Sequence, residues 1–255
     1  VGAIYGFIGE NGSGKSTTEK MICGHLVPDG GEIKLFGRDY TDAGVRVRVG
    51  ALIENAGCFP GSSVYQNLMM QAINLNLKNP DEEIRRVLEI VRMEDSANIK
   101  FKSCSLGMKQ RIGIAMALLG NPSLLVLDEP INGLDADGMR IMREVLCELA
   151  ANYGVTIIIS SHILGELEKI ATHYEIVRDG KMIAEMTATQ LNESCRTYVA
   201  LQTKDMSRTK MLFGVKYSRV EEDEAGYIRV YDEVTPEDIV RYLYENNILI
   251  SEIKT

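Results

Sequence analysis

Nine residues near the start of the chain have the types and spacing of a phosphate-binding loop. Glycine lets backbone N–H groups turn inward around an anion, and a following helix adds the partial positive charge of its N-terminus. Lys15 is expected to reach the β- and γ-phosphates, and the Ser16 hydroxyl is placed to ligate Mg²⁺. The loop follows the apolar run 4–8 and precedes a predicted helix, so the pattern predicts a nucleotide site. Its residues are Gly9, Asn11, Gly12, Ser13, Gly14, Lys15, Ser16 and Thr17, with Glu10 inside the loop.

Two adjacent carboxylates, Asp128 and Glu129, come directly after the apolar run Leu124-Leu125-Val126-Leu127. The carboxyl end of a buried strand is where α/β proteins form ligand sites. We expect Asp128 to hold Mg²⁺ through water, and Glu129 to accept a proton from the attacking water or to orient it. The alternative interpretation is a solvated acidic turn after a strand. The phosphate loop earlier in the chain favours the catalytic interpretation.

Three further segments indicate which class of phosphate-loop protein this is. Ser105-Leu106-Gly107-Met108-Lys109-Gln110-Arg111 opens a predicted helix, Gly133-Leu134-Asp135 follows the acidic pair, and Ser160-Ser161-His162 follows the next apolar strand. A serine and a glycine that open a helix can bind an anion through a hydroxyl, backbone N–H groups and the helix dipole. With the phosphate loop and the acidic strand, this makes five ordered motifs. The order resembles the nucleotide-binding domain of ABC transporters over residues 1 to about 187.

The resemblance implies a role for each motif. The loop 9–17 corresponds to Walker A, the strand 124–129 to Walker B, and Glu129 to the catalytic carboxylate. Asp135 matches the D-loop aspartate and His162 the switch histidine, which would hydrogen-bond the γ-phosphate. A lone histidine after a strand is more often structural, so its position relative to Glu129 is what favours the functional interpretation.

The segment 105–109 matches the signature motif, in which Ser105 and Gly107 would bind the γ-phosphate of ATP held by another protomer. The resemblance therefore implies ATP and Mg²⁺ as ligands. It also implies an ABC-type dimer with a second ATPase domain, in which two ATP molecules lie at the interface, and a monomer that hydrolyses ATP poorly.

The chain departs from the common family pattern in three places. Glu54 stands where the Q-loop normally carries glutamine, and its carboxylate is expected to contact Mg²⁺ and to make this contact more sensitive to metal and pH. The signature reads Ser-Leu-Gly-Met-Lys instead of Ser-Gly-Gly-Gln, although its serine and glycine are kept. The aromatic residue that stacks on adenine in the family would lie before Val1. Together with the stretch 50–54 and Phe59-Pro60, these departures resemble the bacterial exporters for bacitracin and lantibiotic resistance.

The elements that must position these motifs alternate between buried strands and helices, which predicts an α/β fold with a P-loop NTPase core. The expected ABC ATPase domain covers 1–187 and contains a helical subdomain at about 58–119. A lone strand as apolar as 4–8 needs neighbours on both sides, so we expect earlier strands to be missing. Residues 188–255 form a predicted small α+β domain with the ferredoxin-like order βαββαβ, with strands at 197–202, 215–220, 228–231 and 248–253 and helices at 207–213 and 236–246, the second capped by Thr235. In the larger domain, 164–171 is a predicted helix.

Composition narrows the class of protein. The chain has 255 residues, a formal net charge of −8 and five scattered cysteines without a C-x-x-C pair. These features argue against nucleic-acid partners, a disulfide framework and a zinc site. No apolar run approaches the roughly 20 residues that span a bilayer. We expect a cytoplasmic protein that lies on the inner face of the cell membrane beside separate transmembrane permease subunits.

Two competing functions remain at this point. A non-transport ABC ATPase that acts on ribosomes or DNA would usually carry two ATPase domains or long coiled-coil arms, and neither is visible. A nucleoside or small-molecule kinase would share the phosphate loop but would not need the segment 105–109 or His162. The leading interpretation is the ATPase subunit of an ABC exporter.

Overall fold

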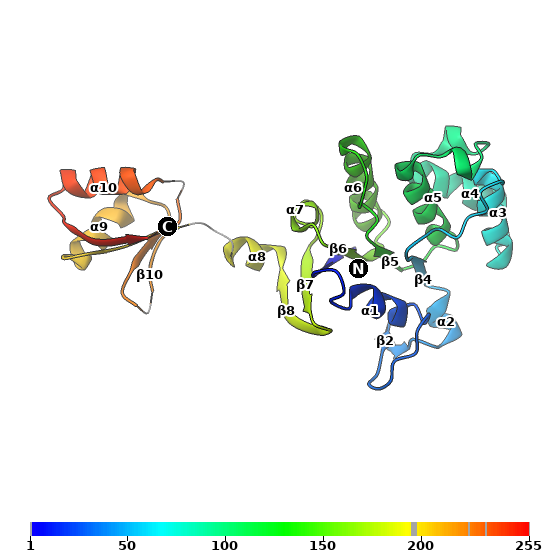
Figure 1. The fold of residues 1–255 in the computed structure, drawn as a ribbon, viewed down its shortest axis with the longest axis horizontal. Coiled ribbons are helices and arrows are strands. Elements are labelled where there is room, and N and C mark those ends of the chain that lie inside the picture. Colours follow the sequence, from blue (N-terminus) through cyan, green and yellow to red (C-terminus); the bar gives the residue numbers. More distant parts are fainter. Residues whose placement is uncertain (1, 195–197, 224, 233, 255) are drawn as a thin grey trace. The chain divides into compact units, whose positions relative to one another are not determined.

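The computed structural model describes residues 2–194, 198–223, 225–232 and 234–254. The chain divides into two compact units, residues 1–188 and residues 189–255, and each is described by itself (Figure 1). The predicted strand 197–202 begins outside the described residues, and Cys195 also lies outside them. The other four cysteines are free. No helix in the described ranges combines the length and apolar character needed to cross a membrane.

A six-stranded sheet forms the centre of the first unit, with the strand order β4-β5-β6-β1-β7-β8. Every neighbouring pair is parallel except β7 and β8, which form an antiparallel hairpin. The strands are β1 (Ile4–Ile8), β4 (Val49–Leu52), β5 (Leu124–Asp128), β6 (Thr156–Ser161), β7 (His173–Arg178) and β8 (Lys181–Thr187). The apolar run of the central strand β5 is buried on both faces, as a parallel strand requires, whereas β8 at the sheet margin is largely exposed.

The sheet order explains why motifs far apart in sequence meet. Strand β6 lies between β5 and β1, and its Ser160 is in register with Asp128 on one side and with Phe7 on the other. The phosphate loop, the acidic pair and the segment 160–162 therefore all leave the same edge of the sheet, at the carboxyl ends of three adjacent strands. This edge is where parallel sheets form ligand sites.

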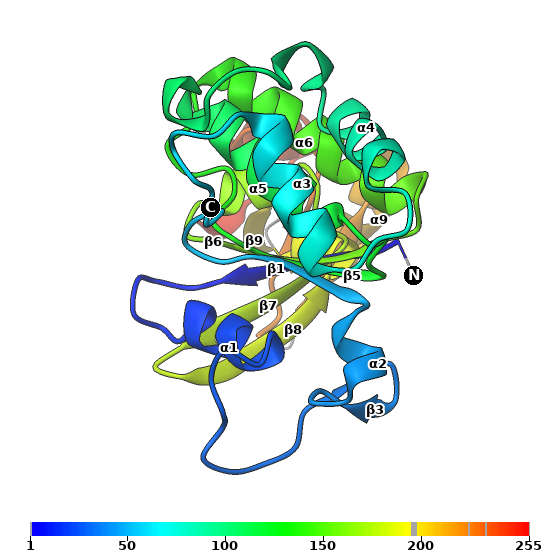
Figure 2. The ribbon, with the colours of Figure 1, turned by 90° about the vertical axis from the view of Figure 1, so that its right-hand side faces the viewer.

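Helices cover both faces of this sheet. Figure 2 shows α1 on one side and α3, α4, α5 and α6 on the other. The helices are α1 (Lys15–Ile22), α2 (Ala43–Arg46), α3 (Val64–Asn74), α4 (Pro80–Ile90), α5 (Leu106–Leu118), α6 (Ala136–Ala151) and α7 (Leu164–Leu167), with 3₁₀ turns at Glu94–Ser96 and Phe101–Ser103. Helices α3 to α5 fall within the segment expected to form the helical subdomain. Separately, β2 (Lys34–Leu35) and β3 (Arg38–Asp39) make a small hairpin near α2 (Figure 2).

The second unit has the predicted ferredoxin-like order, and its antiparallel sheet runs β10-β11-β9-β12. Its elements are β9 (Val199–Thr203), α9 (Met206–Lys216), β10 (Val220–Glu222), β11 (Ile228–Val230), α10 (Pro236–Glu245) and β12 (Ile250–Lys254), preceded by α8 (Ala188–Ser194). The sheet packs its apolar side chains against both helices around a core that includes Leu201, Phe213, Ile228 and Leu243. Thr235 caps α10 as predicted, and Pro236 stands at its start.

Two sequence expectations about element bounds were wrong. The predicted strand 215–220 does not form, because α9 continues to Lys216 and β10 begins only at Val220. Val215 is 87% exposed, so this β-branched residue lies on the outer face of a helix and not in a sheet. The predicted helix 164–171 is also too long, since α7 ends at Leu167.

Candidate functional site

Glycine at two positions shapes the phosphate loop between β1 and α1. Gly14 has a φ of 107°, in the left-handed region that a side chain disfavours. A Cβ atom on Gly9 would lie 2.3 Å from the carbonyl oxygen of Val177, so only glycine lets the loop pack this closely against β7. The amide of Gly180, in the β7–β8 turn, donates to the carbonyl of Ser13 at 2.9 Å. The hairpin therefore braces the loop from outside.

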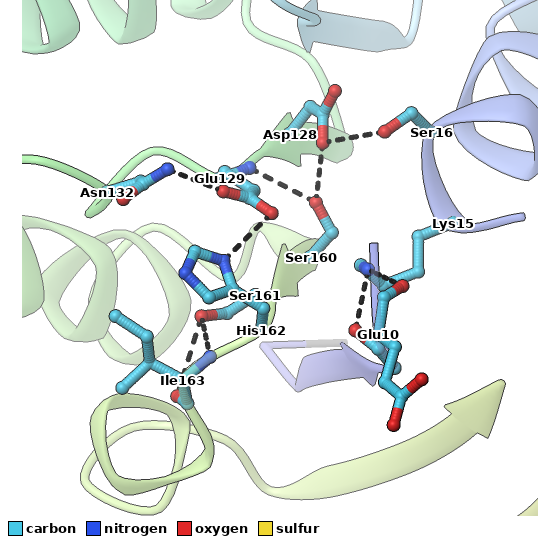
Figure 3. A network of polar contacts seen from close by, with 11 residues as sticks. Glu10, Lys15, Ser16, Asp128, Glu129, Asn132, Ser160, Ser161, His162 and Ile163 are labelled. Carbon is cyan, nitrogen blue, oxygen red and sulfur yellow. Dashed lines mark hydrogen bonds and ion pairs between the residues drawn. The ribbon is translucent and has the colours of Figure 1, made fainter. Parts of the chain in front are cut away.

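Two buried donors line the loop, the Lys15 ammonium and the Ser13 hydroxyl, and among the described residues neither has an acidic partner. Lys15 is 5% exposed, and its Nζ donates to the backbone carbonyls of Gly9 at 2.7 Å and Glu10 at 3.0 Å (Figure 3). The hydroxyl of Ser13 is buried and has no hydrogen-bond partner in the described part of the chain. Buried donors that lack a full set of acceptors are costly unless a ligand satisfies them. A phosphate group fits this requirement.

Asp128 connects three adjacent elements at the sheet edge. Its Oδ1 accepts hydrogen bonds from the Ser16 hydroxyl on α1 at 3.1 Å and from the Ser160 hydroxyl on β6 at 2.8 Å. A hydroxyl and a carboxylate are the oxygen ligands that Mg²⁺ prefers, and Mg²⁺ takes its remaining ligands from phosphate and water. The described residues contain no group of three or more His, Cys, Asp or Glu side chains arranged to hold a metal. The donors present thus fit a cation that is bound together with a phosphate ligand.

The side chain of Glu129 is held at both carboxylate oxygens (Figure 3). Its Oε1 lies 3.1 Å from Nδ1 of His162, and its Oε2 accepts a hydrogen bond from Nδ2 of Asn132 at 2.7 Å. The backbone N–H of Glu129 donates to the Ser160 hydroxyl at 3.1 Å. Since its side chain is 24% exposed and that of His162 36%, a water molecule can reach the carboxylate. The geometry suits a fixed proton acceptor beside a histidine.

Asn132 and Ser160 bond to residues of the site, although the sequence had not assigned either of them to it. Ser160 is fully buried, accepts from the Glu129 backbone and donates to Asp128, so it fixes two adjacent acidic residues. Both had a weak signal in the sequence. Asn132 follows Glu129 by three residues, and Ser160 ends a strand directly before the histidine motif.

Ser105, Gly107 and Asp135 lie in a second group. Ser105 caps α5 by accepting from the Met108 amide at 3.2 Å, and Asp135 caps α6 by accepting from the Gly138 amide at 2.8 Å. The two caps are neighbours, because a Cβ atom on Gly107 would lie 3.8 Å from Leu134 and one on Gly133 would lie 3.1 Å from Leu106. The start of α5 and the loop 133–135 therefore form one surface.

Glu54, expected near the metal, is joined to α1 through Lys20. Its Oε1 lies 2.6 Å from Lys20 Nζ, and its side chain is 63% exposed. The hydrogen bond from Lys20 lowers the pKa of Glu54, and the same bond raises the pKa of Lys20. Sequence reasoning did not single out Lys20, because a lysine in a helix after a phosphate loop carries no motif of its own.

A buried carboxyl group, Glu19, lies behind the site. Its side chain is fully buried, and neither oxygen makes a hydrogen bond of good geometry, although Asp128 and Ser160 lie beside it. Burial, together with the negative charge of Asp128, raises the pKa of Glu19 to about 8. At neutral pH this side chain is therefore mainly a neutral acid in the folded protein.

Comparison with known proteins gives consistent matches. Residues 1–132 match a family model described as ABC transporter. The bacitracin transport ATP-binding protein BcrA of Bacillus licheniformis is 38% identical over 99% of this chain and 84% of its own length. The lantibiotic transport ATP-binding protein SrtF of Streptococcus pyogenes is 39% identical over 72% of this chain and 79% of its own length. The structure of cbiO1 from Clostridium perfringens, described as part of the ABC transporter complex cbiONQ, superposes with a TM-score of 0.68 at 27% identity. It covers 75% of this chain and 80% of that one.

Proposed function

The chain belongs to the ABC transporter family as an ATP-binding and ATP-hydrolysing subunit, and from this premise we propose that it powers an exporter of peptide antibiotics. BcrA and SrtF, two of the relatives that match over most of this chain, are described as transporting bacitracin and a lantibiotic. The proposed substrate class is therefore a peptide antibiotic that the cell expels for resistance or self-protection.

We assign the phosphates of ATP to the loop 9–17 and the metal to the acidic edge beside it. Lys15 and the unpartnered Ser13 hydroxyl support the first assignment, since both are buried donors within the loop. Ser16 and Asp128 support the second, because their oxygens already lie 3.1 Å apart. When bound, Mg²⁺ would neutralise charge on the phosphates and orient the terminal one. Glu54 would approach this cation from the loop after β4.

Glu129 is assigned as the proton acceptor for the attacking water, with His162 and Asn132 holding its carboxylate in place. Fixing the acceptor before the reaction removes the cost of ordering it in the transition state. His162 would also donate to the γ-phosphate once nucleotide is present. The observation that carries the proposal is this arrangement, in which Lys15, Ser16, Asp128, Glu129 and His162 meet at one sheet edge (Figure 3).

The second group, around Ser105, Gly107 and Asp135, is assigned to ATP held by a partner ATPase domain. The Ser105 hydroxyl and the start of α5 form a helix N-terminus that suits an anion. Two caps that face one surface, at the starts of α5 and α6, support a composite site in which each protomer contributes one half. Hydrolysis would then require dimerisation, and a monomer would turn ATP over poorly.

Separate transmembrane permease subunits are the proposed partners of the segment 54–66. A hollow of about 420 Å³ lies next to it, between the loop after β4 and the start of α5, with Cys58, Phe101 and Leu106 among its lining residues. Such a hollow can receive a protruding element of a partner. The chain would then act on the inner face of the membrane. The alternative of a non-transport ABC ATPase on ribosomes or DNA is not favoured, because the named relatives are transport proteins.

The decisive test is the substitution Glu129→Gln in the purified protein. It keeps the shape of the side chain while removing the proton acceptor, so MgATP should still bind while hydrolysis falls by at least about 10². ATP-bound dimers should accumulate and be visible by size-exclusion chromatography. Glu237→Gln, on the exposed surface of α10, serves as the matched control. Near-normal steady-state hydrolysis by Glu129→Gln would remove this residue from the role of base.

A further inference from the structure

One ion pair links the phosphate-loop helix to the loop after β4. Lys20 lies on α1 and Glu54 follows β4, and their charged atoms are 2.6 Å apart. The Lys20 side chain is only 31% exposed, so its stem packs against the protein while its charge points to Glu54. The pair thus joins two segments that both border the proposed nucleotide site.

The position of Lys20 on α1 directs it to the acidic end of this site. Residues four apart on a helix lie on the same face, so Lys20 is one turn beyond Ser16. The Ser16 hydroxyl in turn donates to Asp128, whose charge also acts on Lys20. Lys20 therefore lies near two carboxylates, those of Glu54 and Asp128.

Glu54 creates an electrostatic problem for ATP binding. A triphosphate is strongly negative, and a carboxylate beside it is repelled unless a cation lies between them. Asp128 and Glu129 already place two negative charges at this edge of the sheet. A glutamine, the residue that the family normally carries at this position, would add no charge.

We propose that Lys20 is a positioning residue that holds the Glu54 side chain and cancels its charge, so that the pair meets MgATP as an electrically neutral unit. The inference rests on the proposed function, because it assumes that ATP binds at the loop 9–17. It assigns to Lys20 a role in nucleotide affinity that the phosphate-binding motif does not give it. Removing either side chain alone would then leave an uncompensated charge that changes nucleotide affinity.

A double-mutant cycle tests this coupling. ATP affinity is measured by isothermal titration over a series of Mg²⁺ concentrations, in the Glu129→Gln background to prevent hydrolysis. Lys20→Met should weaken ATP binding about fivefold at low Mg²⁺, the size expected for one uncompensated charge near a partly solvated site. Glu54→Gln should strengthen it by a similar factor and make affinity less dependent on Mg²⁺. The double variant should return to within about twofold of the parent.

Two further variants separate charge from structure. Lys20→Arg keeps the charge and should bind ATP like the parent. Lys34→Met removes a comparable ion pair, since Lys34 Nζ lies 2.7 Å from Glu32, and should change nothing. The inference is overturned if Lys20→Met titrates like the parent, or if the double variant is as weak as Lys20→Met alone. A parent protein that binds no ATP would instead refute the proposed function, so the two failures are distinguishable.

Discussion

Replacing the buried Glu19 by leucine should stabilise the first unit, and the gain should grow with pH. The side chain is fully buried, its oxygens lack good hydrogen bonds, and it lies beside Asp128. A leucine of similar volume can fill this position between α1 and the sheet without a group that needs solvation. The perturbation removes one ionisable group and leaves the phosphate loop itself unchanged.

The magnitude follows from the pKa of Glu19, which is raised from 4.5 in the unfolded chain to about 8 in the folded protein. Because the folded state holds the proton more tightly, the group's contribution to stability is complete below pH 4.5 and is lost as pH rises towards 8. The slope is about 1.4 kcal/mol for each pH unit within this window. Between pH 5.5 and 7.5 the wild-type protein should therefore lose roughly 3 kcal/mol relative to Glu19→Leu.

The assay is urea unfolding of both proteins at several pH values, without nucleotide or metal, followed by far-UV circular dichroism. Hydrogen exchange of amides in α1 and β5 assigns the transition to the first unit. Glu19→Gln is the matched control, since its buried amide is also costly but does not titrate. Its stability should run parallel to that of Glu19→Leu as pH changes. If the wild-type curve also runs parallel to both, the neutral buried acid is refuted.

Two other substitutions test the assigned roles. Ser105→Arg should leave ATP binding by the monomer intact yet abolish ATP-driven dimerisation in the Glu129→Gln background, because the serine would act on nucleotide held by the partner; an unchanged dimer peak in size-exclusion chromatography would count against the composite site. His162→Ala should lower the steady-state hydrolysis rate by about 10² to 10³ while ATP affinity stays within a few-fold, as expected for a preorganised group. Equal losses of rate and affinity would point to a binding role instead.

Much of the first unit could be predicted because its strands are short apolar runs that end in chemically distinctive residues. The runs 4–8 and 124–127 each precede a motif, so strand, loop and helix could be placed together. The pairing of the strands with one another could not be predicted in this way. The order β5-β6-β1 depends on which strands bury which faces against which helices, and local sequence does not encode that choice.

Side-chain partners were the least predictable part of the site. Asn132, Ser160 and Lys20 all bond to residues that the motifs had identified. Asn132 does so within its own loop, Ser160 from the neighbouring strand and Lys20 from α1 to the loop after β4. The end of a helix in the second unit was likewise not predictable from the local sequence. Val215 reads as a strand residue because it is β-branched, but the helix that begins at Met206 continues through it to Lys216.

Glu19 and Lys20 are consecutive on α1, and their different environments follow from helix geometry. Successive residues point about 100° apart, so Glu19 turns towards the sheet while Lys20 turns towards the loop after β4. Each lies near a carboxylate. Because burial keeps Glu19 protonated, its side chain adds no charge beside Asp128. Lys20 cancels the charge of Glu54. The acidic end of the proposed ATP site thus carries less negative charge than its count of acidic residues suggests. This is the physical reason that a third carboxylate, that of Glu54, is compatible there with a triphosphate.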